Sequence, residues 1–229
     1  MYQYSVGLAA FDYVPIVLSG VGLYFVAATA TAWSGRWQQL ARLGAVLIIC
    51  GGISKASWKL IVATAQIDIS WMNTALFFCL APGMLILAGA VWGASRNKGV
   101  GARLLTLAAP ATLIFGAALI ALNWPQQRYH TALLLMLTTI GNVALAGQLI
   151  VKSWHLKRPS ASILFFCNII AVFALAGLAR IPAQTEPLQW LEEFINAFSQ
   201  AAFAYAAYIL YTAVNKKSLE NNHYDINTK

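Results

Sequence analysis

Charged residues are scarce in this sequence: they make up 10% of its 229 residues, and only seven of them are Asp or Glu. Soluble domains carry about 25% charged residues, so this shortage excludes a water-soluble globular protein. The hydrophobic share is 60% and the mean hydropathy is +0.67. A chain this apolar needs lipid as its solvent. We therefore predict an all-α integral membrane protein that is surrounded by the lipid bilayer.

Histidine and cysteine, which ligate many metals, are also few. His130, His155 and His223 fall in predicted loops or in the tail, so none is placed within a span to ligate a haem. The three cysteines lie in apolar segments at spacings that match no zinc or redox motif, and we expect them to pack as small hydrophobes. No Gly-rich phosphate loop and no Ser-His-Asp constellation is present. We expect no metal, no cofactor and no catalytic residue, which argues against an enzyme.

The basic residues give a net charge of +8 and stand in small groups between apolar segments. This distribution is typical of membrane proteins and differs from the continuous basic surface of a nucleic-acid-binding protein. We therefore expect no nucleic-acid partner.

Several apolar segments are each long enough to cross a membrane, which takes about 20 residues. We count seven, at 11–33, 41–64, 71–94, 103–123, 131–152, 161–181 and 190–214. The first of them has no basic region ahead of it and is long enough to span, so we expect no cleavable signal peptide. Residues 1–215 are predicted to form one seven-helix transmembrane domain, and 216–229 a short polar cytoplasmic tail without fixed structure.

The basic residues between and after these segments predict the orientation. On one side there are eleven: Arg36, Arg42, Arg96, Lys98, Arg103, Lys152, Lys157, Arg158, Lys216, Lys217 and Lys229. The other side has Arg128 and Arg180 and carries five acidic residues. Cytoplasmic connections are enriched in Lys and Arg. The N-terminus is therefore predicted to lie outside and the C-terminus in the cytoplasm, with the plasma (inner) membrane as the expected location.

Two stretches of the sequence suggest an internal repeat. "WKLIVATAQIDISWMN" (58–73) and "ARIPAQTEPLQWLEEF" (179–194) share a basic residue, a Gln and a Trp in that order. A parallel repeat of three helices on each side of a middle helix would produce this similarity, and loose alignment of apolar, Ala-rich helices would produce it too. The three-one-three layout resembles that of the SWEET and PQ-loop sugar transporters, which implies a binding site at the repeat interface. The resemblance is to layout only, because Pro125 and Gln126 lie in a predicted external loop rather than in the first helix of a repeat.

Two lysines stand within the second segment, in "GGISKASWKLIVATAQ" (51–66). An ionised residue at the centre of a span costs about 2.5–3.5 kcal/mol. Lys55 and Lys59 are four residues apart and share a helix face. Lys59 is near enough to the outer end to extend along its stem to the interface, whereas Lys55 is too deep. Two like charges this close repel, so we expect either that anionic groups face the two lysines or that one lysine is uncharged.

The seventh segment supplies candidate partners in "WLEEFINAFSQ" (190–200), at the depth expected for Lys59. Acidic residues in a first helical turn are also favoured by the helix dipole alone. Asp12 lies at the outer end of the first segment. The predicted ligand-binding residues are Lys55, Lys59, Arg180, Glu192, Glu193, Asn196 and Gln200.

These residues predict an outward-facing polar pocket between the second, sixth and seventh helices. The first hypothesis is transport or binding of a small anionic or zwitterionic solute. The second is a receptor-like or accessory protein that binds a ligand or a membrane partner subunit without transport, either alone or as a homo-oligomer. The third, ranked last, is a lipid-modifying enzyme that uses the two glutamates with a lysine.

Overall fold

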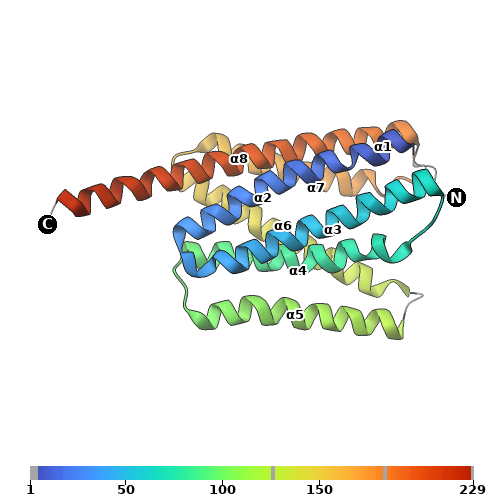
Figure 1. Cartoon of the computed structure of the whole chain (residues 1–229), viewed down its shortest axis with the longest axis horizontal. Coiled ribbons are helices and arrows are strands. Elements are labelled where there is room, and N and C mark those ends of the chain that lie inside the picture. The colour runs from blue at the N-terminus through green and yellow to red at the C-terminus, as the bar shows by residue number, and fades with distance from the viewer. Residues whose placement is uncertain (1–4, 125–126, 183–184, 228–229) are drawn as a thin grey trace.

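The chain folds into a bundle of long α-helices (Figure 1). The computed structural model describes residues 5–124, 127–182 and 185–227. These residues form no strand, and their elements are α1 (Val6–Phe11), α2 (Tyr13–Trp33), the 3₁₀ helix η1 (Gly35–Trp37), α3 (Gln38–Ala65), α4 (Ser70–Ser95), α5 (Val100–Asn123), α6 (Tyr129–His155), α7 (Pro159–Leu178) and α8 (Glu186–Asn227). The all-α prediction is confirmed. Pro125 and Gln126 lie outside the described residues.

Seven helical segments are long and apolar enough to cross a membrane, as predicted from the sequence. The first combines α1 with α2 over Val6–Trp33, and the second combines η1 with α3 over Gly35–Ala65. The others are α4 to α7 and α8 as far as Lys217. The chain is thus a multi-pass membrane protein with short connections between its spans.

Six of the spans form a ring, and one lies outside it. Following the chain, α2, α3, α4, α6, α7 and α8 each pack on the next, and α8 closes the ring on α2. Helix α5 packs on α4 and α6 from outside (Figure 1). Only 11% of its most apolar stretch is buried, against 39% for α4. Three consecutive helices thus lie in the ring on each side of α5, which fits the predicted layout, and the repeat itself stays a prediction.

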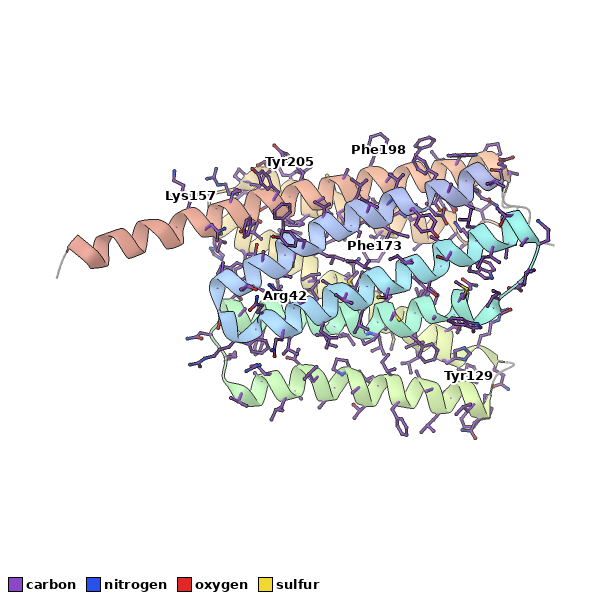
Figure 2. All side chains as sticks on the ribbon, viewed as in Figure 1. Arg42, Tyr129, Lys157, Phe173, Phe198 and Tyr205 are labelled. Carbon is purple, nitrogen blue, oxygen red and sulfur yellow. The ribbon has the colours of Figure 1, made fainter. Side chains whose placement is uncertain are left out.

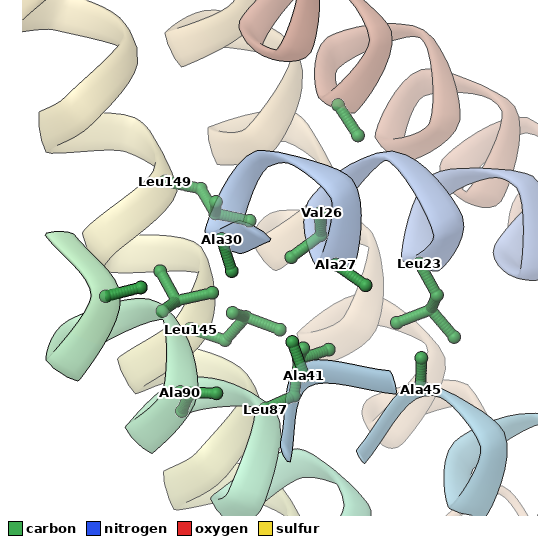
Figure 3. Packing of buried hydrophobic residues seen from close by; sticks show 14 of the residues in the cluster. Leu23, Val26, Ala27, Ala30, Ala41, Ala45, Leu87, Ala90, Leu145 and Leu149 are labelled. Carbon is green, nitrogen blue, oxygen red and sulfur yellow. The ribbon is translucent and has the colours of Figure 1, made fainter. Parts of the chain in front are cut away.

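The hydrophobic core fills one half of the ring, at the end opposite to α1. Its residues come from all six ring helices: the last part of α2, the first parts of α3 and α7, the last parts of α4 and α6, and the middle of α8. Figure 3 shows the part of the core between α2, α3, α4 and α6. Those labelled are Leu23, Val26, Ala27, Ala30, Ala41, Ala45, Leu87, Ala90, Leu145 and Leu149. Many are alanines, and small residues let membrane helices approach closely.

Helices α3 and α4 pack with their backbones close together at Gly44. A Cβ added at Gly44 would lie 2.8 Å from the Gly83 carbonyl oxygen and 2.8 Å from the Leu87 nitrogen, both of which are backbone atoms. We expect Gly44→Ala to lower the free energy of unfolding by about 1–3 kcal/mol, because overpacking forces helices apart. Gly116→Ala on α5 is the matched control, since nothing lies within 4 Å of its added Cβ.

Thermal unfolding of the purified protein in detergent measures both variants. Gly116→Ala should be neutral or should stabilise by up to about 1 kcal/mol, because Ala is the better helix former. Equal melting temperatures for the two variants would contradict the close packing of α3 on α4.

The predicted tail differs from expectation. Helix α8 continues beyond the bundle as far as Asn227 (Figure 1), so the expectation that the tail lacks fixed structure is wrong. No glycine or proline follows Pro187, and nothing in the sequence therefore interrupts the helix. Residues 228–229 lie outside the described residues.

Candidate functional site

The first span is interrupted near its start, at Asp12. Proline has no N–H group, so Pro15 cannot donate to the Phe11 carbonyl four residues before it. Helix α1 ends at Phe11 and α2 begins at Tyr13. The interruption places the buried Asp12 carboxylate inside the bundle, one turn or more beyond the start of the span.

Lys59 on α3 joins Asp12 to α8. Its Nζ lies 2.7 Å from Asp12 Oδ2 and 3.0 Å from Glu193 Oε1, to which it donates a hydrogen bond. The side chains of Lys59, Asp12 and Glu193 are 13%, 8% and 15% exposed. We call these three residues the ion cluster. Lys59 is therefore held by carboxylates inside the bundle, and the alternative that it extends to the interface is wrong.

The ion cluster connects helices that lie on opposite sides of α2. Both α3 and α8 pack against α2 (Figure 1). Lys59 extends from α3 and Glu193 from α8, and Asp12 lies at the junction of α1 and α2. The Lys59 ammonium group therefore links α3, the α1–α2 junction and α8, at the end of the bundle where α1 lies.

Hydrogen bonds fix the part of α3 that carries Lys59. The Tyr13 hydroxyl and the Ser57 hydroxyl are 2.8 Å apart, which ties α3 to α2. Ser54 Oγ donates to the Met72 carbonyl at 2.8 Å, which ties α3 to α4. Both bonds lie within five residues of Lys59, so its position does not depend on the ion pairs alone.

Aromatic rings pack between α1 and α8 beside the ion cluster. The Phe11 ring lies 5.5 Å from that of Trp190 and 5.2 Å from that of Phe194, between centroids. Phe11 precedes Asp12, and Phe194 follows Glu193. These ring contacts join α1 to α8 at the level of the ion cluster.

Lys55 lies one turn from Lys59 along α3, toward the middle of the membrane. It falls on the stripe of α3 that includes the buried residues Gly51, Trp58 and Val62. Lys55 makes no ion pair with any described residue, although the charges of Asp12 and of both Glu192 and Glu193 act on it. With every group ionised, Lys55 and the ion cluster carry two positive and two negative charges.

A cavity of about 340 Å³ lies within the ring. All six ring helices contribute to its wall, which is mainly apolar. Its polar lining residues are Ser19, Thr138, Thr139, Asn142, Asn168, Asn196 and Gln200. Asn196 and Gln200, two of the predicted ligand-binding residues, line this cavity, and that they bind a ligand stays a prediction. The cavity also has walls on α4 and α6, which the sequence did not indicate.

The ion cluster lies at one end of this cavity. On the first span, the lining begins with Pro15, three residues after Asp12. On α8 it begins with Asn196, three residues after Glu193. On α3 it ends with Gly52, which is seven residues before Lys59. A helical turn advances about 5.4 Å, so the cluster is one to two turns beyond the lining.

The other end of the cavity meets the hydrophobic core. Leu23, Leu145 and Phe203 line the cavity and are also buried members of the core. On each of these helices the residues further along, such as Val26 and Leu149, belong to the core alone. The cavity therefore ends inside the protein at packed side chains.

The lining amides differ in their hydrogen bonding. Asn168 Nδ2 donates to the Ser199 hydroxyl at 2.8 Å and to the Ser199 carbonyl at 3.1 Å, which joins α7 to α8. Asn142, Asn196 and Gln200 make no such side-chain bond with the described residues and are half-buried. Their amide groups are therefore available to a solute.

Two predicted residues stand apart from the others. Arg180 is exposed, beyond the end of α7 at Leu178. Glu192 is half-buried, does not line the cavity and is not a member of the ion cluster, although its charge acts on Lys55. Asp12, by contrast, was absent from the predicted set. The sequence could have indicated Asp12, because its carboxylate lies at the depth expected for Lys59.

Among the residues that the structure describes, no group of three or more His, Cys, Asp and Glu side chains is placed to hold a metal ion. Comparisons with protein-family models, with curated proteins and with solved structures found no match for this chain. Its function therefore has to be inferred from the site itself.

Proposed function

We propose that this protein transports a small zwitterionic or anionic solute, which binds in the cavity beneath the ion cluster. The observation that carries the proposal is the division of the ring into two halves. In one half, the interior of the ring holds a cavity with polar groups on its wall, and in the other half the interior is a packed core. A solute site near the middle of a membrane, closed on one side by packed helices, is the arrangement expected of a carrier caught open to the other side.

The orientation of the chain supports an outward-facing site. Arg42 and Lys157 lie at the end of the bundle opposite to α1, and Tyr129 lies at the α1 end (Figure 2). The connections at the Arg42 end carry most of the basic residues, which is typical of the cytoplasmic side. The cavity and ion cluster then belong to the outer half, and the core to the cytoplasmic half.

The chemistry of the site favours a solute with a carboxylate or a phosphate group. Lys55 does not itself line the cavity, but on α3 it is three residues beyond the lining residue Gly52 and four before Lys59. It makes no ion pair with any described residue. An ammonium group in a membrane interior is stabilised by an anion. The amides of Asn142, Asn196 and Gln200 add hydrogen-bonding groups that suit the polar part of the same solute.

Uptake into proteoliposomes that contain the purified protein tests the proposal. A panel of radiolabelled solutes should include an amino acid, a dicarboxylate, an organic phosphate, a neutral sugar and an organic cation. We expect accumulation of a zwitterion or an anion. Accumulation of the sugar or the cation alone would contradict the assigned chemistry, and tight binding without accumulation would favour the receptor-like hypothesis over transport.

Asn196→Leu is expected to reduce the uptake of that solute about two- to tenfold. The change keeps the branched shape of the side chain and removes an amide worth about 0.5–1.5 kcal/mol, where each 1.4 kcal/mol is about tenfold in affinity. Asn123→Leu is the matched control, because Asn123 is exposed at the end of α5 and bonds to its own helix. Equal uptake by the two variants would remove Asn196 from the site.

A further inference from the structure

A second hollow lies on the membrane-facing side of the bundle. It has a volume of about 610 Å³ and lies beside α2, with further walls from α3 and α8. We call it the α2–α3 groove. Its lining residues are Gly20, Tyr24, Ala27, Ala28, Thr31, Ala32, Arg42, Ala45, Val46, Ile49, Tyr211 and Asn215. A volume in the range of about 300–1,000 Å³ is typical of a site for a small ligand.

The groove changes from polar to apolar along its length. At the predicted cytoplasmic end stand Arg42, Asn215 and Thr31. Toward the middle of the membrane stand Gly20 and Ile49. On α2 the lining extends over 12 residue steps, from Gly20 to Ala32, or about 18 Å at 1.5 Å per residue. One leaflet contributes about half of the 30 Å hydrocarbon core, so the groove has the depth of one leaflet.

Arg42 is positioned at the polar end. In the amide orientation that its surroundings favour, the Gln38 side-chain oxygen accepts from Arg42 Nη2 at 2.6 Å and from Nη1 at 3.3 Å. Gln38 precedes Arg42 by one helical turn. A guanidinium group has five N–H donors, and most of them are therefore left for a ligand. Arginine is also the residue best suited to paired hydrogen bonds with a phosphate.

The ligand that matches this groove must have an anionic head at the depth of Arg42 and an apolar body that extends toward Gly20. We propose that the α2–α3 groove binds one anionic phospholipid of the cytoplasmic leaflet. The phosphate accepts from Arg42 and the Asn215 amide, and an acyl chain lies along Ala27, Ala28 and Val46. Basic pockets between membrane helices on the cytoplasmic side bind anionic headgroups in this way. The groove shares one lining residue, Ile49, with the solute cavity, and the proposal does not depend on the transport function.

Thermal unfolding of the purified protein in a neutral detergent tests the site, with added phosphatidylglycerol, phosphatidylcholine or inorganic phosphate. We expect phosphatidylglycerol to raise the melting temperature of the unchanged protein and phosphatidylcholine to raise it less. Binding only to the folded state gives this concentration-dependent rise. A rise with inorganic phosphate as large as that with phosphatidylglycerol would overturn the proposal, because the acyl chain would then contribute nothing.

Two variants locate the effect. Arg42→Gln should abolish the phosphatidylglycerol-dependent rise, whereas Arg158→Gln should keep it, since Arg158 is exposed at the same end of the bundle and does not line the groove. Ala28→Leu fills the apolar part of the groove without changing charge and should reduce the rise as well. If Arg42→Gln and Ala28→Leu both respond to phosphatidylglycerol as the unchanged protein does, the groove is not the binding site.

Discussion

Lys59→Met is expected to lower the free energy of unfolding by about 3–5 kcal/mol, the range measured when one partner of a buried ion pair is removed. The variant leaves the carboxylates of Asp12 and Glu193 without the ammonium that lies 2.7 Å and 3.0 Å from them. Both carboxylates are largely buried, so water compensates little of the lost interaction. The link from α3 to α8 is lost at the same time.

Thermal unfolding in detergent measures the effect, and a combined variant separates the charge from the packing. Lys59→Met with Asp12→Asn and Glu193→Gln removes all three charges and should recover most of the stability. Lys98→Met, at the opposite end of the bundle, is the control, because Lys98 is exposed. A Lys59→Met protein as stable as the control would mean that the ion cluster contributes nothing to the fold.

Lys55→Met is expected to reduce solute affinity about 30-fold or more while leaving stability unchanged or higher. Removing one partner of a buried charge pair costs about 2–5 kcal/mol of binding free energy, at about 1.4 kcal/mol for each factor of ten. Without solute, Lys55 makes no ion pair with the described residues, so the protein loses no such contact. A long apolar side chain is also cheaper to bury at this depth.

The two lysines therefore give a joint test. They are four residues apart on one helix and carry the same charge, yet one should act on stability and the other on solute binding. Isothermal titration calorimetry measures the solute affinity of Lys55→Met, and proteoliposomes measure its uptake. Its melting temperature is recorded in parallel. If Lys55→Met destabilises as strongly as Lys59→Met and leaves binding intact, Lys55 belongs to the ion cluster rather than to the solute site.

The number and kind of helices were predictable because hydropathy alone decides them. The residues at which the helices begin and end were less predictable, and the errors changed which residues were assigned to the site. The first span was predicted from residue 11, whereas it begins at Val6. Asp12 was therefore taken as a residue at the margin, although it lies more than one turn inside. Arg180 shows the reverse error, since the predicted segment reached 181 and α7 ends at Leu178.

The pairing of Lys59 with Glu193 was predictable from their depth in the membrane. Both were placed in the outer part of their spans, which run in opposite directions. The cavity walls on α4 and α6 were not predictable. A helix that is apolar on all sides has no pattern to indicate which face is inward. This holds for α4. On α6, Thr138 and Asn142 are four residues apart and share a face with Thr139 beside them, but only the ring arrangement of the six helices brings that face to the cavity.

The peripheral helix α5 determines how the first three ring helices, α2 to α4, are oriented relative to the last three, α6 to α8. The helices α2 to α4 cross the membrane three times and end on the cytoplasmic side in the proposed orientation. A direct connection from there would start the next three helices from the opposite face. The extra crossing of α5 restores the starting side, so α6 runs in the same direction as α2. A single additional crossing, made by a lipid-exposed helix, is therefore enough to let α2–α4 and α6–α8 both begin on the same side of the membrane.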